Sequence, residues 1–268
     1  MAYESDHLER TALAELHQAA RPDMISFLRL STAQVGSALL SMAPGMPASA
    51  IVINRAIGAG LTEPETPETV RDMVETYREA GVPYYFIHRH PEAQPAEMVE
   101  WLREQGLEKA RGWQKFRRGQ EPVPEVETDL RVEKIGPEHR LAFAHLVCAA
   151  FDLGEVAEGW LEALPECPNW HAFMSFDGDE PVGAGAVFIL GGLAWTDFGA
   201  TAPTHRQRGS QSAVLAARIR FALDQGCREI FTCTGEEVAG DPQHSYKNIL
   251  KLGFREDYLR ENYAPPRQ

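Results

Sequence analysis

Short apolar runs alternate with amphipathic segments through the second half of the chain, and glycine or polar turns separate them. Alternation at every second residue is typical of a strand, whereas a period of three to four residues is typical of a helix. The pattern predicts a strand, a helix, three strands, a helix, a strand, a helix and a last strand. We place them at 132–135, 136–151, 170–176, 181–190, 193–201, 209–225, 229–234, 245–252 and 258–263.

The first half carries a similar pattern towards its end. It predicts a strand, a helix, a strand, a helix and a strand at 50–54, 67–79, 83–88, 96–105 and 112–117. Glycine is common just past a helix end, and it occurs there in both halves, at Gly81, Gly106, Gly226 and Gly253. Two interpretations stay open from this pattern: an internal repeat, or a chance agreement in the order of elements.

A polar, acidic segment with two prolines, Pro122 and Pro124, separates the halves. Such a composition is typical of a linker. A chain of 268 residues suits one large domain or two modest ones. We therefore expect a first domain at 1–120, a linker at 121–129 and a second domain at 130–268.

The formal net charge of −13 argues against a nucleic-acid partner, because phosphates require a basic face. It is compatible with a cationic substrate such as an amine. No apolar stretch approaches the roughly 18 residues that span a bilayer, and the first residues do not resemble a signal peptide. We expect a cytoplasmic protein with no membrane partner. The four cysteines show no zinc spacing, so we expect reduced thiols and no metal.

One turn stands out, because it follows the expected strand 193–201 and leads directly into the helix 209–225. It contains Arg206, Arg208 and Gly209. The first amides of a helix lack partners within the helix and lie at the positive end of its dipole, so they can bind a phosphate. Arginines add forked donors, and glycine lets the backbone approach a ligand closely. The alternative is an ordinary solvated turn.

The sequence from Arg206 to Gln211 resembles the acyl-CoA pyrophosphate loop of the GNAT acetyltransferases, although Gln211 stands where the family prefers a small residue. Lys251-Leu-Gly-Phe254 is similar to the family's helix-end signature. The resemblance covers about residues 130–263. It implies an α/β fold with two GNAT-like domains in tandem, each a mostly antiparallel mixed sheet flanked by helices.

The first half resembles a degenerate copy. Gly58 and Gly60 stand where the phosphate turn would lie, but Glu63, Glu65 and Glu68 follow them. Carboxylates at a helix start would repel a pyrophosphate. We expect the first half to support the second and to shape an acceptor cleft rather than to bind CoA.

The resemblance implies acetyl-CoA or another acyl-CoA as co-substrate. Backbone groups at the end of the strand 193–201 would bind the pantetheine arm, the turn would bind the pyrophosphate, and Ser245 and Asn248 would touch the cofactor from the last helix. The implied cofactor-binding residues are Ala200, Thr201, Ala202, Arg206, Gln207, Arg208, Gly209, Ser210, Gln211, Ser212, Ser245 and Asn248.

The family transfers the acyl group directly, so the four cysteines need no role as nucleophiles. Its usual Asn and Tyr are replaced by Pro242 and Ile249. Tyr246 lies one turn before Ile249 and either serves as the acid or only packs. Asp197, expected on the same strand face as Trp195, and Glu236 are the candidate bases. For Glu236, an exposed and solvated loop glutamate is the alternative.

Three functions follow from this resemblance. The first is an N-acetyltransferase acting on a primary amine, which is a small metabolite, an antibiotic-like amine or a protein amino group. The second is a sensor or scaffold that binds CoA without turnover, favoured by the missing Tyr and Asn and by Gln211. The third is a structural module in which neither half binds CoA. The oligomeric state is left as monomer or homodimer.

Overall fold

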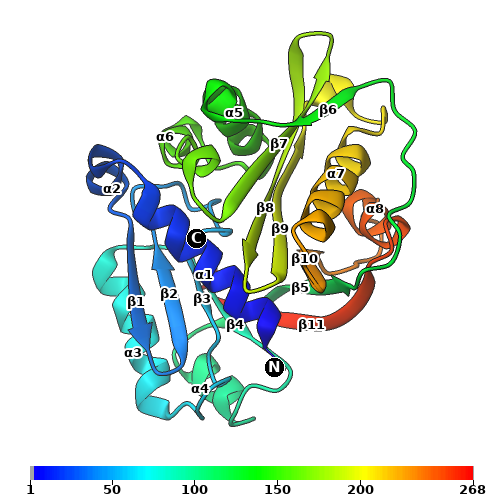
Figure 1. Ribbon diagram of the computed structural model, residues 1–268. Helices are drawn as coiled ribbons and strands as arrows, with labels where there is room; N and C mark the ends of the chain where they lie inside the picture. The colour runs from blue at the N-terminus through cyan, green and yellow to red at the C-terminus, as the bar shows by residue number, and fades with distance from the viewer. Residues whose placement is uncertain (1–2, 268) are drawn as a thin grey trace.

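The computed structural model describes residues 3–267 and contains, within that range, one sheet of eleven strands flanked by helices (Figure 1). The strands are β1 Ser31–Val35, β2 Ala38–Met42, β3 Arg55–Ile57, β4 Phe86–Arg89, β5 Glu108–Arg118, β6 Arg131–Lys134, β7 Trp170–Asp177, β8 Glu180–Leu190, β9 Leu193–Thr201, β10 Glu229–Gly235 and β11 Arg255–Ala264. The helices are α1 Glu4–Ala19, α2 Pro22–Leu28, α3 Pro67–Ala80, α4 Met98–Glu104, α5 Arg140–Phe151, α6 Glu158–Leu161, α7 Ser210–Asp224 and α8 His244–Lys251.

The strands of the two halves interleave at the centre of the sheet. The order is β1-β2-β3-β4-β11-β5-β10-β9-β8-β7-β6, so that β11 lies between β4 and β5, and β5 lies between β11 and β10. The pairs β3–β4 and β9–β10 are parallel and the others are antiparallel. The expected fold class, a mostly antiparallel mixed sheet with flanking helices, is confirmed.

The sequence pattern located most elements from residue 67 onwards, including both glycine-terminated helices of each half. Gly81 adopts a left-handed conformation at the end of α3, with φ 78°. The strand expected at 50–54 is wrong. Those residues form turns, with the amide of Ile53 bonded to Ala50 O over 3.1 Å, and the strand begins at Arg55. The apolar run there is buried in a turn, which a two-residue period cannot distinguish from a strand.

Helix α1 crosses one face of the sheet and joins the two halves (Figure 1). It packs with α5 and α6 over β8 and β9, in a core that contains Leu16, Trp160 and Trp195. Helices α7 and α8 cover the opposite face, in a core with Val187 and Ile219. Since successive strand residues face opposite sides, β7 to β9 supply both cores.

Residues 119–130 contain no helix or strand and connect β5 to β6 outside the sheet (Figure 1). The division into two domains joined by a linker stays a prediction, because β5 and β11 each pair with strands of the other half. None of the helices within residues 3–267 is long and apolar enough to span a bilayer.

Candidate active site

The two parallel central strands separate part of the way along their length. β9 and β10 pair only from Leu193 to Trp195 on β9. At the point of separation the hydroxyl of Thr232 donates to Thr196 O over 3.1 Å. Beyond Thr196, the edge of β9 that faces β10 has no strand partner within the described residues. An unpaired edge of this kind can bind an extended ligand as an added strand.

A cavity of about 380 Å³ opens where the strands separate. Its size falls in the range of small-molecule sites. The first half supplies Ile51, Val52, Arg55 and Trp113. The second half supplies Ala150, Phe151, Thr196, Asp197, Phe198, Gly199, Gln211, Leu215, Arg218, Thr232, Cys233, Thr234, Gly235, Ser245, Asn248 and Ile249. Both halves are therefore needed to form this cavity.

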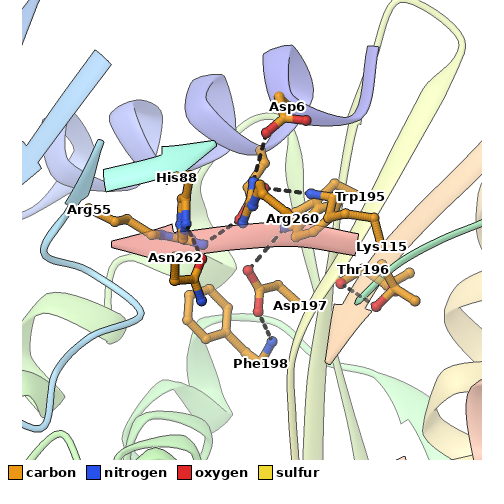
Figure 2. A network of polar contacts seen from close by, with 12 residues as sticks. Asp6, Arg55, His88, Lys115, Trp195, Thr196, Asp197, Phe198, Arg260 and Asn262 are labelled. Atoms are coloured by element: carbon orange, nitrogen blue, oxygen red, sulfur yellow. Dashed lines mark hydrogen bonds and ion pairs between the residues drawn. The ribbon is translucent and has the colours of Figure 1, made fainter. Parts of the chain in front are cut away.

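Asp197 is held at the cavity wall by one hydrogen bond to each carboxyl oxygen (Figure 2). The indole Nε1 of Trp195 donates to Oδ2 over 3.0 Å, which confirms that the two residues share a face of β9. The amide of Phe198 donates to Oδ1 over 2.7 Å. Phe198 has φ 55° and lies at a bulge in the pairing of β9 with β8. Burial raises the pKa of Asp197, against the opposing attraction of Arg55.

The other two catalytic candidates do not line the cavity, and their catalytic roles stay predictions. The Glu236 carboxylate accepts from the amide of Gly112 over 2.9 Å and extends the pairing of β10 with β5. The Tyr246 hydroxyl donates to the Glu256 carboxylate, and its ring packs edge-on against Phe116. Burial and the Glu256 carboxylate raise the pKa of Tyr246, so its phenol keeps its proton.

Helix α8 instead presents Ser245, Asn248 and Ile249 to the cavity. Ile249 is the position at which the family resemblance places a tyrosine. An apolar side chain therefore occupies that part of the wall. Cys233 also lines the cavity, and burial raises the pKa of its thiol to about 12. This thiol is protonated at neutral pH and is a poor nucleophile.

The start of α7 offers free amides. No side chain caps this 15-residue helix, and no acidic residue lies in its first turn. The exposed side chains of Arg206 and Gln207 flank the turn, and Arg206 has no side-chain partner within residues 3–267. Ser210 is buried, where its hydroxyl contacts Ser175 over 2.8 Å, and Ser212 follows it on α7.

Arg208 and Gly209 have roles that the sequence pattern did not predict. Nη1 of Arg208 donates to Asp177 over 2.6 Å, and Nη2 pairs with Asp129. These two carboxylates neutralise its charge. Gly209 has φ 82°, and a Cβ there would lie 2.6 Å from Glu127 O. The backbone that approaches this glycine closely is therefore that of residues 119–130, and Arg208 fastens that segment to the turn.

Three predicted cofactor-binding residues meet between α7 and α8. The side-chain nitrogen Nε2 of Gln211 donates to Ser245 Oγ over 2.9 Å, and Asn248 Nδ2 donates to Gln211 Oε1 over 2.8 Å. The Gln211 side chain thus bridges the two helices in the lining of the cavity. At the end of β9, Ala200 and Thr201 pair with β8, and the Ala202 amide donates to Val182 O over 2.8 Å.

No family model matches the sequence, and no curated protein does. Solved structures, however, match almost the whole chain. A GCN5-related N-acetyltransferase from Kribbella flavida has a TM-score of 0.66 and 17% identity, covering 99% of this chain and 96% of that one. A tandem GNAT protein from the clavulanic acid biosynthesis pathway covers the same shares with a TM-score of 0.59 and 15% identity. The chain has the tandem GNAT fold. A GCN5-related N-acetyltransferase from Sphaerobacter thermophilus covers 85% of this chain and 80% of that one, with a TM-score of 0.60 and 15% identity.

A buried charge cluster beside the GNAT-fold cavity went unrecognised in the sequence. Asp6 of α1 pairs with Arg260 (Figure 2). Glu9 of the same helix pairs with Arg55, Lys115 and Arg260. One signal was present. Asp6 and Glu9 lie on the same face of the helix as the apolar residues Leu13 and Leu16. Acids on a buried helical face need cationic partners, so this pattern predicts buried ion pairs.

Proposed function

We propose that the protein is an acyl-CoA-dependent N-acyltransferase that moves an acetyl group from acetyl-CoA to a primary amine by direct attack. The observation that carries the proposal is the position of Asp197. It lies in the cavity wall where the unpaired edge of β9 leads towards the uncapped start of α7. Asp197 suits a general base, the unpaired strand edge suits the extended pantetheine arm of CoA, and the uncapped helix start suits its diphosphate.

The residues present fit an acyl-CoA. The free amides at Ser210 and Gln211, together with the Arg206 side chain, would hold the diphosphate, because an uncapped helix start favours anions. The unpaired edge from Gly199 to Thr201 would bind the pantetheine arm. An acyl-CoA supplies the thioester carbonyl that the amine attacks. Arg208 is not part of this set, since two carboxylates already bind it.

Asp197 would accept the proton of the attacking amine. Each of its oxygens accepts one hydrogen bond and retains a further lone pair. Its raised pKa makes its ionised form a better base than an exposed aspartate. With Ile249 in the wall, α8 presents no tyrosine to donate a proton to the departing thiolate.

A thermal shift with acetyl-CoA, followed by thiol release with a panel of primary amines, tests the proposal. We expect Arg206→Ala to weaken acetyl-CoA binding about tenfold, because it removes a charge-assisted contact. Arg208→Ala is the matched control and should weaken binding less. Absence of any shift with the wild-type protein would exclude CoA binding altogether.

A second function is favoured by two observations, namely the Gln211 bridge across α7 and α8 and the apolar Ile249. Both suit a protein that binds CoA without turnover. The experiments above separate the two functions, because a sensor would give a thermal shift with acetyl-CoA and no thiol release with any amine.

A further inference from the structure

The cavity is surrounded by more buried positive than negative charge. Four cationic side chains are each at most 4% exposed: Arg55 and Arg218 line the cavity, and Lys115 and Arg260 join Arg55 around Glu9. The acids among the described residues that face them are Asp6, Glu9 and Asp197. Four cations thus meet three acids, and a positive charge remains even when Asp197 is ionised. Charge buried without compensation is strongly unfavourable, so an anion is expected nearby.

Arg218 is the first cation without a counter-ion. Its Nη1 donates to Ala186 O over 3.0 Å and to Asp197 O over 2.8 Å. No carboxylate among residues 3–267 lies within ion-pair distance of it. Burial lowers the pKa of Arg218 to about 10, so the side chain is still charged at neutral pH. Gly185 makes room for it, since a Cβ there would lie 2.7 Å from the guanidinium carbon.

Arg55 is the second cation whose charge and donors are incompletely paired. Nη1 pairs with Glu9, but Glu9 also binds Lys115 and Arg260. Nε of Arg55 is buried and has no hydrogen-bond partner. The guanidinium carbon lies 5.1 Å from the centre of the Trp113 ring, and both residues line the cavity. A buried donor without a partner is destabilising, and a ligand oxygen would satisfy it.

We propose that this cavity binds a carboxylate carried by a substrate, with Arg55 as the contacting donor and Arg218 as the supporting charge. The inference rests on the proposed acyl transfer and narrows its substrates to those that carry an anionic group. Arginine is well suited to this role, because its planar fork matches a carboxylate. Two substrates can present that group: an amino-acid acceptor, or a dicarboxylic acyl group on CoA.

The first arm of the test compares amines that differ only in a carboxylate. Each amino acid is compared with the amine that lacks only its carboxylate. The pairs are glycine with methylamine, β-alanine with ethylamine, 4-aminobutyrate with propylamine, and 6-aminohexanoate with pentylamine. Binding is measured by thermal shift without any acyl-CoA, and transfer is measured as kcat/KM with acetyl-CoA. We expect at least one amino acid to stabilise the protein more than its partner and to react about tenfold faster, as for one charge-assisted contact.

The second arm compares succinyl-CoA with acetyl-CoA, using the plain amines as acceptors. A preference of about tenfold for succinyl-CoA would place the carboxylate on the acyl group instead. Equal behaviour in both arms, including the thermal shift, overturns the inference. A failure of the proposed function looks different, because neither thioester would release thiol with any amine while the carboxylate-dependent thermal shift would persist.

Variants then test the contacting residue. Arg55→Lys keeps a positive charge beside Glu9 but removes the forked donor, and it should reduce the carboxylate preference to about twofold or less. Arg78→Lys is the matched control, since Arg78 pairs with Glu75 on the surface and its side chain is 69% exposed. Full preference retained in a folded Arg55→Lys protein would overturn the role of Arg55. If that variant does not fold, the wild-type substrate pairs decide.

Discussion

Trp195 and Asp197 lie two residues apart on β9, and the indole of Trp195 donates to the Asp197 carboxylate over 3.0 Å. The ammonium of Lys115 lies 4.0 Å from the centre of the same Trp195 ring. The ring is 1% exposed and cannot turn away. The tryptophan thus orients the carboxylate, while the cation behind the ring holds the tryptophan in place.

Asp197→Asn should lower kcat by about 10²-fold or more, because an amide cannot accept the amine proton. Acetyl-CoA affinity should be unchanged. In the wild-type protein, kcat/KM should fall as the pH falls through the raised pKa of Asp197, since only the ionised form is a base. A variant that retains full kcat with this pH dependence intact would contradict the assignment.

Gln211→Ala should strengthen acetyl-CoA binding. The side chain of Gln211 bridges α7 to Ser245 and Asn248 on α8 in the lining of the cavity, and its removal leaves more room there while the backbone amide remains. Titration calorimetry with acetyl-CoA measures the effect. Ser212→Ala, one residue further along α7, serves for comparison. Weaker binding after Gln211→Ala would show that this side chain contacts the cofactor instead.

Acid should destabilise the fold through His17, which is buried and hydrogen-bonded to Ser41 Oγ over 3.0 Å. Burial, assisted by Arg55, lowers the pKa of His17 to about 4. The unfolded chain therefore binds a proton below its ordinary pKa of about 6.5, whereas the folded chain does so only near pH 4. Between pH 7 and pH 5 this residue alone should remove about 2 kcal/mol of stability. Urea unfolding at the two pH values should show a smaller loss for His17→Gln, and an identical loss would refute the assignment.

Gly185→Ala should destabilise the protein by about 1–3 kcal/mol, because overfilling a packed site forces neighbours to move. The added Cβ would meet Arg218 Cζ at 2.7 Å and Val214 Cγ1 at 2.9 Å. Gly119→Ala is the control, since its nearest neighbour is the Glu121 carboxylate at 3.2 Å, the end of a flexible exposed side chain. Equal unfolding midpoints in urea for the two variants would mean that Arg218 moves without cost.

The candidate site was only partly predictable from the sequence. The turn before α7 and the shared strand face of Trp195 and Asp197 follow from neighbours in the chain, and both were predicted. Glu236 was placed correctly at the end of a strand, but its side chain turned to Gly112 of the first half. Arg208 looked like a phosphate ligand because Asp129 and Asp177 lie far from it in the chain.

The sequence by itself determined the local structure of this protein: the strand–turn–helix at residues 193–225, the glycines that end helices, and the α/β character of the fold. Each depends on residues within one or two turns of each other, whose backbone preferences act locally. Only the tertiary structure decided that β11 lies between β4 and β5 and that Arg55 lines the same cavity as Asp197. Those contacts join residues more than a hundred positions apart, and burial selects them through packing and charge compensation that no local pattern encodes.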